Sequence, residues 1–126
     1  MRIKFLIIAF LFGLISCKTN NSNMEICFGN IQNRIGSDSI LKKLMLSPID
    51  SYRDFASIIN RAVTEESKSN SICKTALSKF LLENKENSIT VNNLIFFQQF
   101  QAYLKHEKFN KSKARDIALK FEEKWK

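Results

Sequence analysis

The chain has 126 residues, 44% of them hydrophobic, which suffices for one domain with a single modest core. Its formal net charge is +8, from 20 Lys and Arg residues against 12 Asp and Glu residues. This basic balance suits either an anionic partner or a solvated lysine surface that keeps a small domain soluble.

The first seventeen residues have the features of a bacterial export signal. Arg2 and Lys4 form a positively charged start, and residues 5–14 form an apolar segment that is too short to span a bilayer as a mature helix. The tetrapeptide Leu14-Ile15-Ser16-Cys17 follows, with a small residue directly before the cysteine. An ordinary secretory signal and an uncleaved N-terminal anchor are the two alternative interpretations.

This tetrapeptide resembles the lipobox of bacterial lipoproteins. The resemblance implies that the Cys17 thiol receives a diacylglycerol, that the signal is cut just before Cys17, and that the new amino terminus is acylated. We therefore expect a signal peptide (1–16), a lipidated tether (17–23) and a single α-helical domain (24–126). Lys18 follows the cysteine, as in lipoproteins sorted to the outer membrane.

The expected location is the bacterial outer membrane or cell surface, with the periplasmic face as an alternative. Export argues against nucleic acid as a partner of the basic chain. Anionic lipid, an acidic glycan or an acidic protein remain as partners, beside the membrane itself through the lipid anchor. The oligomeric state is left open.

The other two cysteines, Cys27 and Cys73, form a candidate pair. An exported, oxidising compartment permits a disulfide between them, and two buried free thiols are the alternative. Two cysteines and the single histidine do not make a structural zinc site, which normally takes four ligands. We expect neither a metal nor a cofactor.

Helical spacing of apolar residues dominates the first half of the domain. The first helix carries, on one face, Met24, Cys27, Phe28, Ile31 and Ile35. Gly36 is expected to end this helix, and Ser37-Asp38 to start a short second one. Ser47 is a predicted N-cap of the third helix and Pro48 its first residue, and polar residues 65–71 are predicted to end it.

Three further helices complete a predicted all-α fold, a small bundle of five or six helices. The fourth carries Cys73 and Phe80, and residues 84–88 form a loop. Thr90 is expected to cap the fifth, which runs to about Lys108. The last begins at Asn110 or Ser112, and its apolar stripe is Ile117, Phe121 and Trp125, flanked by Ala114 and Ala118.

The fifth helix has more apolar surface than one stripe holds. Phe96 and Phe97 are adjacent and point about 100° apart, while Phe100 and Tyr103 broaden the face. Either neighbouring helices cover this surface on both sides, or part of it is exposed. The second interpretation makes Phe96, Phe97, Phe100 and Tyr103 a candidate partner-binding patch, because aromatic side chains dominate binding energy where they fill a pocket.

The last helix is the second candidate for binding. Its basic residues are Lys111, Lys113, Arg115, Lys120, Lys124 and Lys126. A basic amphipathic helix can lie on an anionic membrane, or it can dock its apolar face on the bundle and leave its lysines in water.

Motifs for catalysis are nearly absent. His106 is the only histidine and lies in a charged segment, and the chain has no phosphate-binding glycine loop, metal-binding histidine pair or nucleophile elbow. We predict a non-enzyme without catalytic residues that acts by binding. In its signal, composition and helical content the chain resembles small outer-surface lipoproteins of AT-rich bacteria. The alternatives are an immunity or inhibitor lipoprotein that blocks a toxin or lysozyme, and an accessory subunit of an envelope complex.

Overall fold

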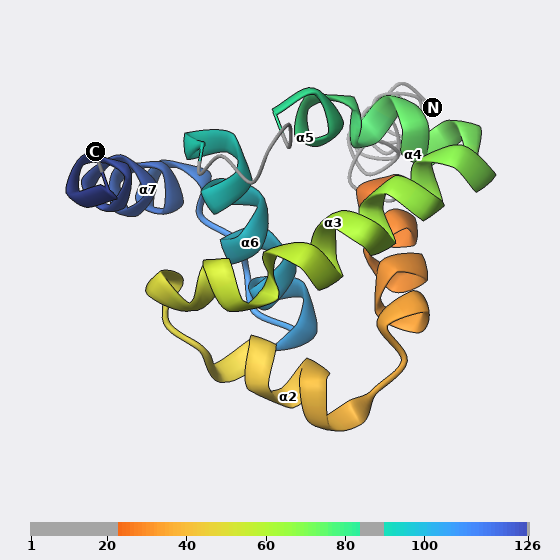
Figure 1. Cartoon of the computed structure of the whole chain (residues 1–126), viewed down its shortest axis with the longest axis horizontal. Coiled ribbons are helices and arrows are strands. Elements are labelled where there is room, and N and C mark those ends of the chain that lie inside the picture. Colours follow the sequence, from red (N-terminus) through yellow and green to blue (C-terminus); the bar gives the residue numbers. More distant parts are fainter. Residues whose placement is uncertain (1–22, 84–89, 126) are drawn as a thin grey trace, which may run out of the picture.

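The computed structural model describes residues 23–83 and 90–125, and every regular element in these ranges is a helix (Figure 1). The elements are a first helix (residues 23–35), α2 (Asp38–Leu46), the 3-10 helix η1 (Ile49–Ser51), α3 (Tyr52–Ser69), α4 (Ser71–Ala76), α5 (Ser78–Glu83), α6 (Val91–Leu104) and α7 (Lys111–Trp125). The predicted all-α small bundle is confirmed. The lipobox, the tether up to residue 22 and the predicted loop 84–88 lie outside the described residues.

The helix α6 is the centre of the bundle. It packs against α7, α2, α5 and η1, and Figure 1 shows it crossing behind α3 in the middle of the molecule. A helix with neighbours on several sides needs apolar residues around most of its surface. In the described ranges no helix combines the length and the apolar composition needed to cross a bilayer.

The end of the first helix follows the predicted local signals. Gly36 has a φ of 68°, in the left-handed region that favours glycine, and its N–H donates to the carbonyl oxygen of Gln32 at 3.0 Å. Ser37 then caps α2, because its side-chain oxygen accepts from the N–H of Ile40 at 3.4 Å. Both boundary predictions are confirmed.

The start of the third helix differs from the prediction. Ser47 does not cap α3: its N–H donates to the carbonyl oxygen of Leu44, and its hydroxyl donates to the carbonyl oxygen of Lys43, so it closes α2 instead. Pro48 is extended, with a ψ of 167°, and η1 intervenes before α3 begins at Tyr52. Ser47-Pro48 therefore marks the end of α2 and the start of η1, and not the start of α3.

The end of the third helix was also predicted too early. Residues 65–69 continue α3, and two of them, Glu66 and Ser67, are each only 4% exposed. Asn70 ends the helix and caps the next one, since its side-chain oxygen accepts from the N–H groups of Ile72 and Cys73. The predicted fourth helix is broken at Leu77 into α4 and α5.

The predicted disulfide is present. Cys27 of the first helix and Cys73 of α4 are bonded, with a Cα–Cα distance of 5.5 Å, and both are 0% exposed. The bond joins two elements that are 46 residues apart in the chain and fixes the first helix to one end of the bundle. The alternative of two free thiols is wrong.

The last two helices meet through small residues. α6 ends at Leu104, earlier than predicted, and α7 packs on it with Ala114, Ala118 and Phe121 buried. Ile117 is 37% exposed, so the predicted stripe is wrong at this residue. Alanine at two contact positions leaves room for close helix approach, which turns the buried face of α7 away from Ile117. The side chain of Trp125 lies outside the described side chains.

Candidate functional site

The aromatic residues of α6 form the core rather than an open surface. Phe96 is 2% exposed, and Phe97 and Phe100 are 0% exposed. Phe28 of the first helix covers one side, with ring centroids 5.5 Å from Phe96 and 5.6 Å from Phe100, and Tyr52 covers Phe97 at 5.6 Å. Of the two interpretations of this surface, burial on both sides by neighbouring helices therefore holds for these three phenylalanines, which are not exposed.

Tyr103, the fourth residue of the predicted patch, is partly buried and belongs to the same cluster. Its ring lies 5.4 Å from Phe28 and 6.4 Å from Phe100. Its hydroxyl lies against Gly29, where an added Cβ atom would come within 3.2 Å of the Tyr103 oxygen. The absence of a side chain at Gly29 therefore makes room for the tyrosine hydroxyl.

Two glutamines of α6 hold neighbouring segments in place. The Gln101 side-chain amide donates to the carbonyl oxygens of Leu44 and Ser47, at 2.8 and 2.7 Å, and so satisfies the C-terminal end of α2. The Gln98 amide donates to the carbonyl oxygen of Ala114 at 2.9 Å. Both residues were missed by the sequence interpretation, which treated α6 by its aromatic content alone.

Tyr52 is a core residue whose side chain has a shifted pKa. Burial raises the pKa of its phenol above 10.0, and a side-chain hydrogen bond with Asn93 offsets part of that rise. The phenol therefore stays neutral at physiological pH. Its environment suits a structural tyrosine rather than an acid or base that acts on a ligand.

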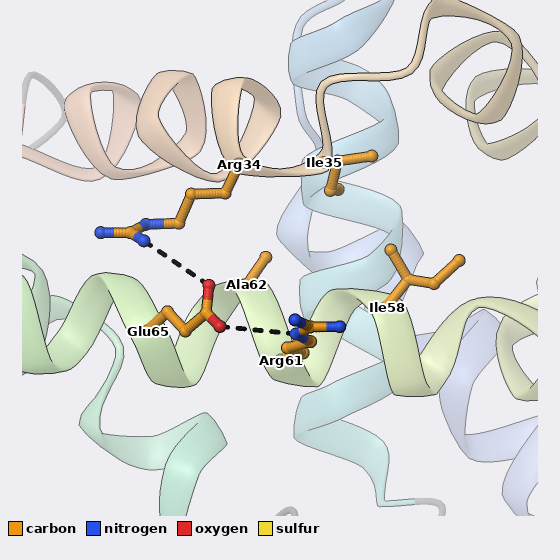
Figure 2. A pocket seen from close by; sticks show the side chains of 6 residues that line it. All are labelled: Arg34, Ile35, Ile58, Arg61, Ala62 and Glu65. Carbon is orange, nitrogen blue, oxygen red and sulfur yellow. Dashed lines mark hydrogen bonds and ion pairs between the residues drawn. The ribbon is translucent and has the colours of Figure 1, made fainter.

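A polar cluster joins the first helix to α3, and Figure 2 shows three of its side chains, those of Arg34, Glu65 and Arg61. The Arg34 Nε atom donates to the Glu66 carboxylate at 2.7 Å, and the Asn30 amide donates to the same carboxylate at 2.7 Å. Arg34 also pairs with Glu65, which in turn pairs with Arg61. The hollow that these residues border is walled by Ile35, Ile58 and Ala62.

The polar cluster is a brace between two helices. The Glu66 side chain is 5% exposed and already has two donors, and Arg34 is engaged with both glutamates and with Ser69. A buried carboxylate needs such partners, because desolvation without them is costly. The arginines are thus occupied within the protein, which makes this hollow a poor candidate for binding an anion.

Removing the arginine of this brace should destabilise the protein strongly. Arg34→Ala leaves the Glu66 carboxylate buried without its charged partner, and we expect the free energy of unfolding to fall by about 3 kcal/mol. Arg61→Ala is the matched control: its side chain is 81% exposed, so the expected loss is below about 0.5 kcal/mol. Urea unfolding of both variants tests the difference, and equal losses would contradict a bracing role.

A groove between η1 and α7 is the better candidate for binding. It has a volume of about 500 Å³ and is lined by Ile49, Asp50, Ile117, Lys120, Phe121 and Lys124. Its surface is mostly apolar, and two exposed lysines and the exposed Asp50 stand on it, so its lysines outnumber its carboxylates. Such a combination suits a partner with apolar side chains beside carboxylates. We call it the η1–α7 groove.

The η1–α7 groove and the chain start lie at opposite ends of the molecule. Figure 1, in which the longest axis is horizontal, places α7 at one end and the start of the described chain, beside α4, at the other. Within residues 23–83 and 90–125, no three metal-ligating side chains gather. His106 is exposed and has a positive φ of 57° in the turn after α6.

No protein-family model matches the chain, and neither a curated protein nor a solved structure matches it.

Proposed function

We propose that this protein is a lipid-anchored helical binding protein of the bacterial outer membrane or cell surface. The observation that carries the proposal is the order of a charged start, a short apolar segment and the tetrapeptide Leu14-Ile15-Ser16-Cys17. The Cys27–Cys73 disulfide supports export, because such bonds form and persist in oxidising compartments outside the cytosol.

The anchor makes a direct prediction about Cys17. Replacing it with alanine (Cys17→Ala) removes the acceptor thiol, so labelled palmitate should enter the wild-type protein and not the variant. The variant should also leave the membrane fraction, since acyl chains contribute about 0.8 kcal/mol per buried methylene to membrane binding. Equal labelling of both proteins would contradict a lipoprotein, and a Cys27→Ala, Cys73→Ala variant that still takes up label controls for loss of cysteine in general.

The binding surface that best fits this role is the η1–α7 groove. Ile49, Ile117 and Phe121 supply apolar contact. The two ammonium groups of Lys120 and Lys124 outnumber the single carboxylate of Asp50 and favour a partner that carries carboxylates. A protein held by its N-terminal end and carrying this groove at the other end would present it away from the membrane. We therefore infer an acidic protein partner.

Charge reversal in the groove tests this surface. Lys120→Glu with Lys124→Glu should abolish retention of the acidic protein that the wild-type domain captures from envelope extract. Lys111→Glu with Lys113→Glu is the matched control, because these lysines are also exposed on α7 and change the net charge equally, but do not line the groove. Equal loss in both pairs would indicate general electrostatics and contradict the groove as the site.

The same capture distinguishes an immunity or inhibitor lipoprotein from other binding proteins. An acidic catalytic cleft, such as the carboxylate pair of a lysozyme, would be complementary to the lysines of α7. A toxin or lysozyme retained by the wild-type chain, and inhibited by it, would assign this second function. A retained envelope complex would instead assign an accessory subunit.

A further inference from the structure

Two exposed isoleucines flank the disulfide. Ile26 is 48% exposed and Ile72 is 47% exposed, and each directly precedes one of the bonded cysteines. Because the cysteine Cα atoms are 5.5 Å apart, the isoleucine Cα atoms lie within about 13 Å of each other. The disulfide therefore fixes two exposed apolar residues on neighbouring segments of the surface.

A hollow lies beside these isoleucines. It is lined by Asn23, Ser71, Ile72, Thr75 and Ala76, and so lies between the start of the first helix and α4. Ile26 follows Asn23 by three residues, which places both on one side of the first helix. We call this surface, made of Ile26, Ile72 and Ala76 with a rim of amide and hydroxyl side chains, the disulfide patch.

The position of the disulfide patch in the chain points to what covers it. Asn23 comes six residues after Cys17, and six residues span at most about 22 Å in any conformation. An acyl chain on Cys17 would therefore hold the patch within that distance of the lipid headgroups. An apolar surface with a polar rim is the type that settles at the boundary between headgroups and acyl chains.

We infer that the disulfide patch rests on the lipid surface that holds Cys17, with Ile26 and Ile72 in contact with lipid. This inference rests on the proposed lipid anchor. The contact sets the orientation of the domain and directs α7, at the opposite end, away from the membrane (Figure 1).

Tryptophan fluorescence in membranes tests the contact. The lipidated full-length protein is placed in vesicles that contain brominated phospholipid, which quenches tryptophan on contact, with Ile72→Trp or Ile26→Trp as two independent probes. Leu119→Trp on α7 is the matched control, because Leu119 is 46% exposed, close to the 47% of Ile72. Fluorescence from Trp125 is subtracted using the parent protein, and an intact disulfide with unchanged helicity shows that each variant is folded.

We expect the fluorescence added at residues 26 and 72 to be quenched and that added at residue 119 to be unaffected. If palmitate labelling shows an anchored protein but neither probe is quenched, or if the residue-119 probe is quenched equally, the contact is overturned while the anchor stands. Absence of palmitate from the wild-type protein overturns the anchor and the contact together. These outcomes separate the inference from the proposed function on which it rests.

Discussion

Replacing both disulfide cysteines (Cys27→Ala with Cys73→Ala) should lower the free energy of unfolding by about 4 kcal/mol. The bond closes a loop with a sequence separation of 46 residues, so its loss raises the conformational entropy of the unfolded chain. Both residues are also 0% exposed, and the smaller alanine side chains leave space in the core. The total free energy of unfolding of a small domain is only about 5–15 kcal/mol, so the expected loss is a large fraction of the stability.

Urea unfolding of the double variant and of the wild-type protein measures this loss. Cys17→Ala serves as the control, because it removes a cysteine and leaves the disulfide intact. Reduction of the wild-type protein with a thiol should reproduce the effect of the double variant. A difference below about 1 kcal/mol would contradict a major stabilising role for the bond.

Phe97→Ala and Phe100→Ala should each lower the free energy of unfolding by roughly 3–5 kcal/mol, the typical cost of truncating a buried phenylalanine. Both side chains are 0% exposed, and Phe97 contacts the Tyr52 ring edge-to-face at 5.6 Å. Leu119→Ala is the control, since a side chain that is 46% exposed should cost about 0.5 kcal/mol or less.

Thermal and urea unfolding of these variants, together with capture of the partner, decides the role of α6. A phenylalanine variant that kept wild-type stability but lost partner binding would contradict a purely structural role for that residue. It would support the predicted partner-binding patch on α6 instead. If every variant that loses binding also loses stability, α6 has only a structural role as the central helix of the core.

The features that could be predicted from the sequence depend on residues close together in the chain. Gly36 and Ser37 mark a helix boundary by their own backbone and side-chain preferences, and Thr90 caps α6 by accepting from the N–H of Asn93. The disulfide was predictable for a different reason, because it was the only pairing left once Cys17 was assigned to the lipid. The lipobox lies outside the described residues and stays a prediction.

The missed features depend on residues that are distant in the chain. Glu66 is buried because Arg34, 32 residues earlier, reaches it, and Gln101 is buried because α2 ends beside it, more than 50 residues earlier. Neither contact leaves a local signal in the sequence. The η1–α7 groove likewise depends on where α7 docks, which is set by the small side chains of Ala114 and Ala118.

The disulfide also determines how the domain would carry a mechanical load. A protein held through Cys17 is pulled at residue 23, and Cys27 follows one helical turn later. Tension can therefore unwind only that first turn before it reaches a covalent bond, which passes the force to Cys73 and α4. The segment after Cys27 is shielded from stretching. This segment contains the remaining hydrogen bonds of the first helix and the aromatic contacts of Phe28. With the proposed lipid anchor at Cys17, the anchor point and the crosslink together would let the domain bear tension at its start without losing its shape.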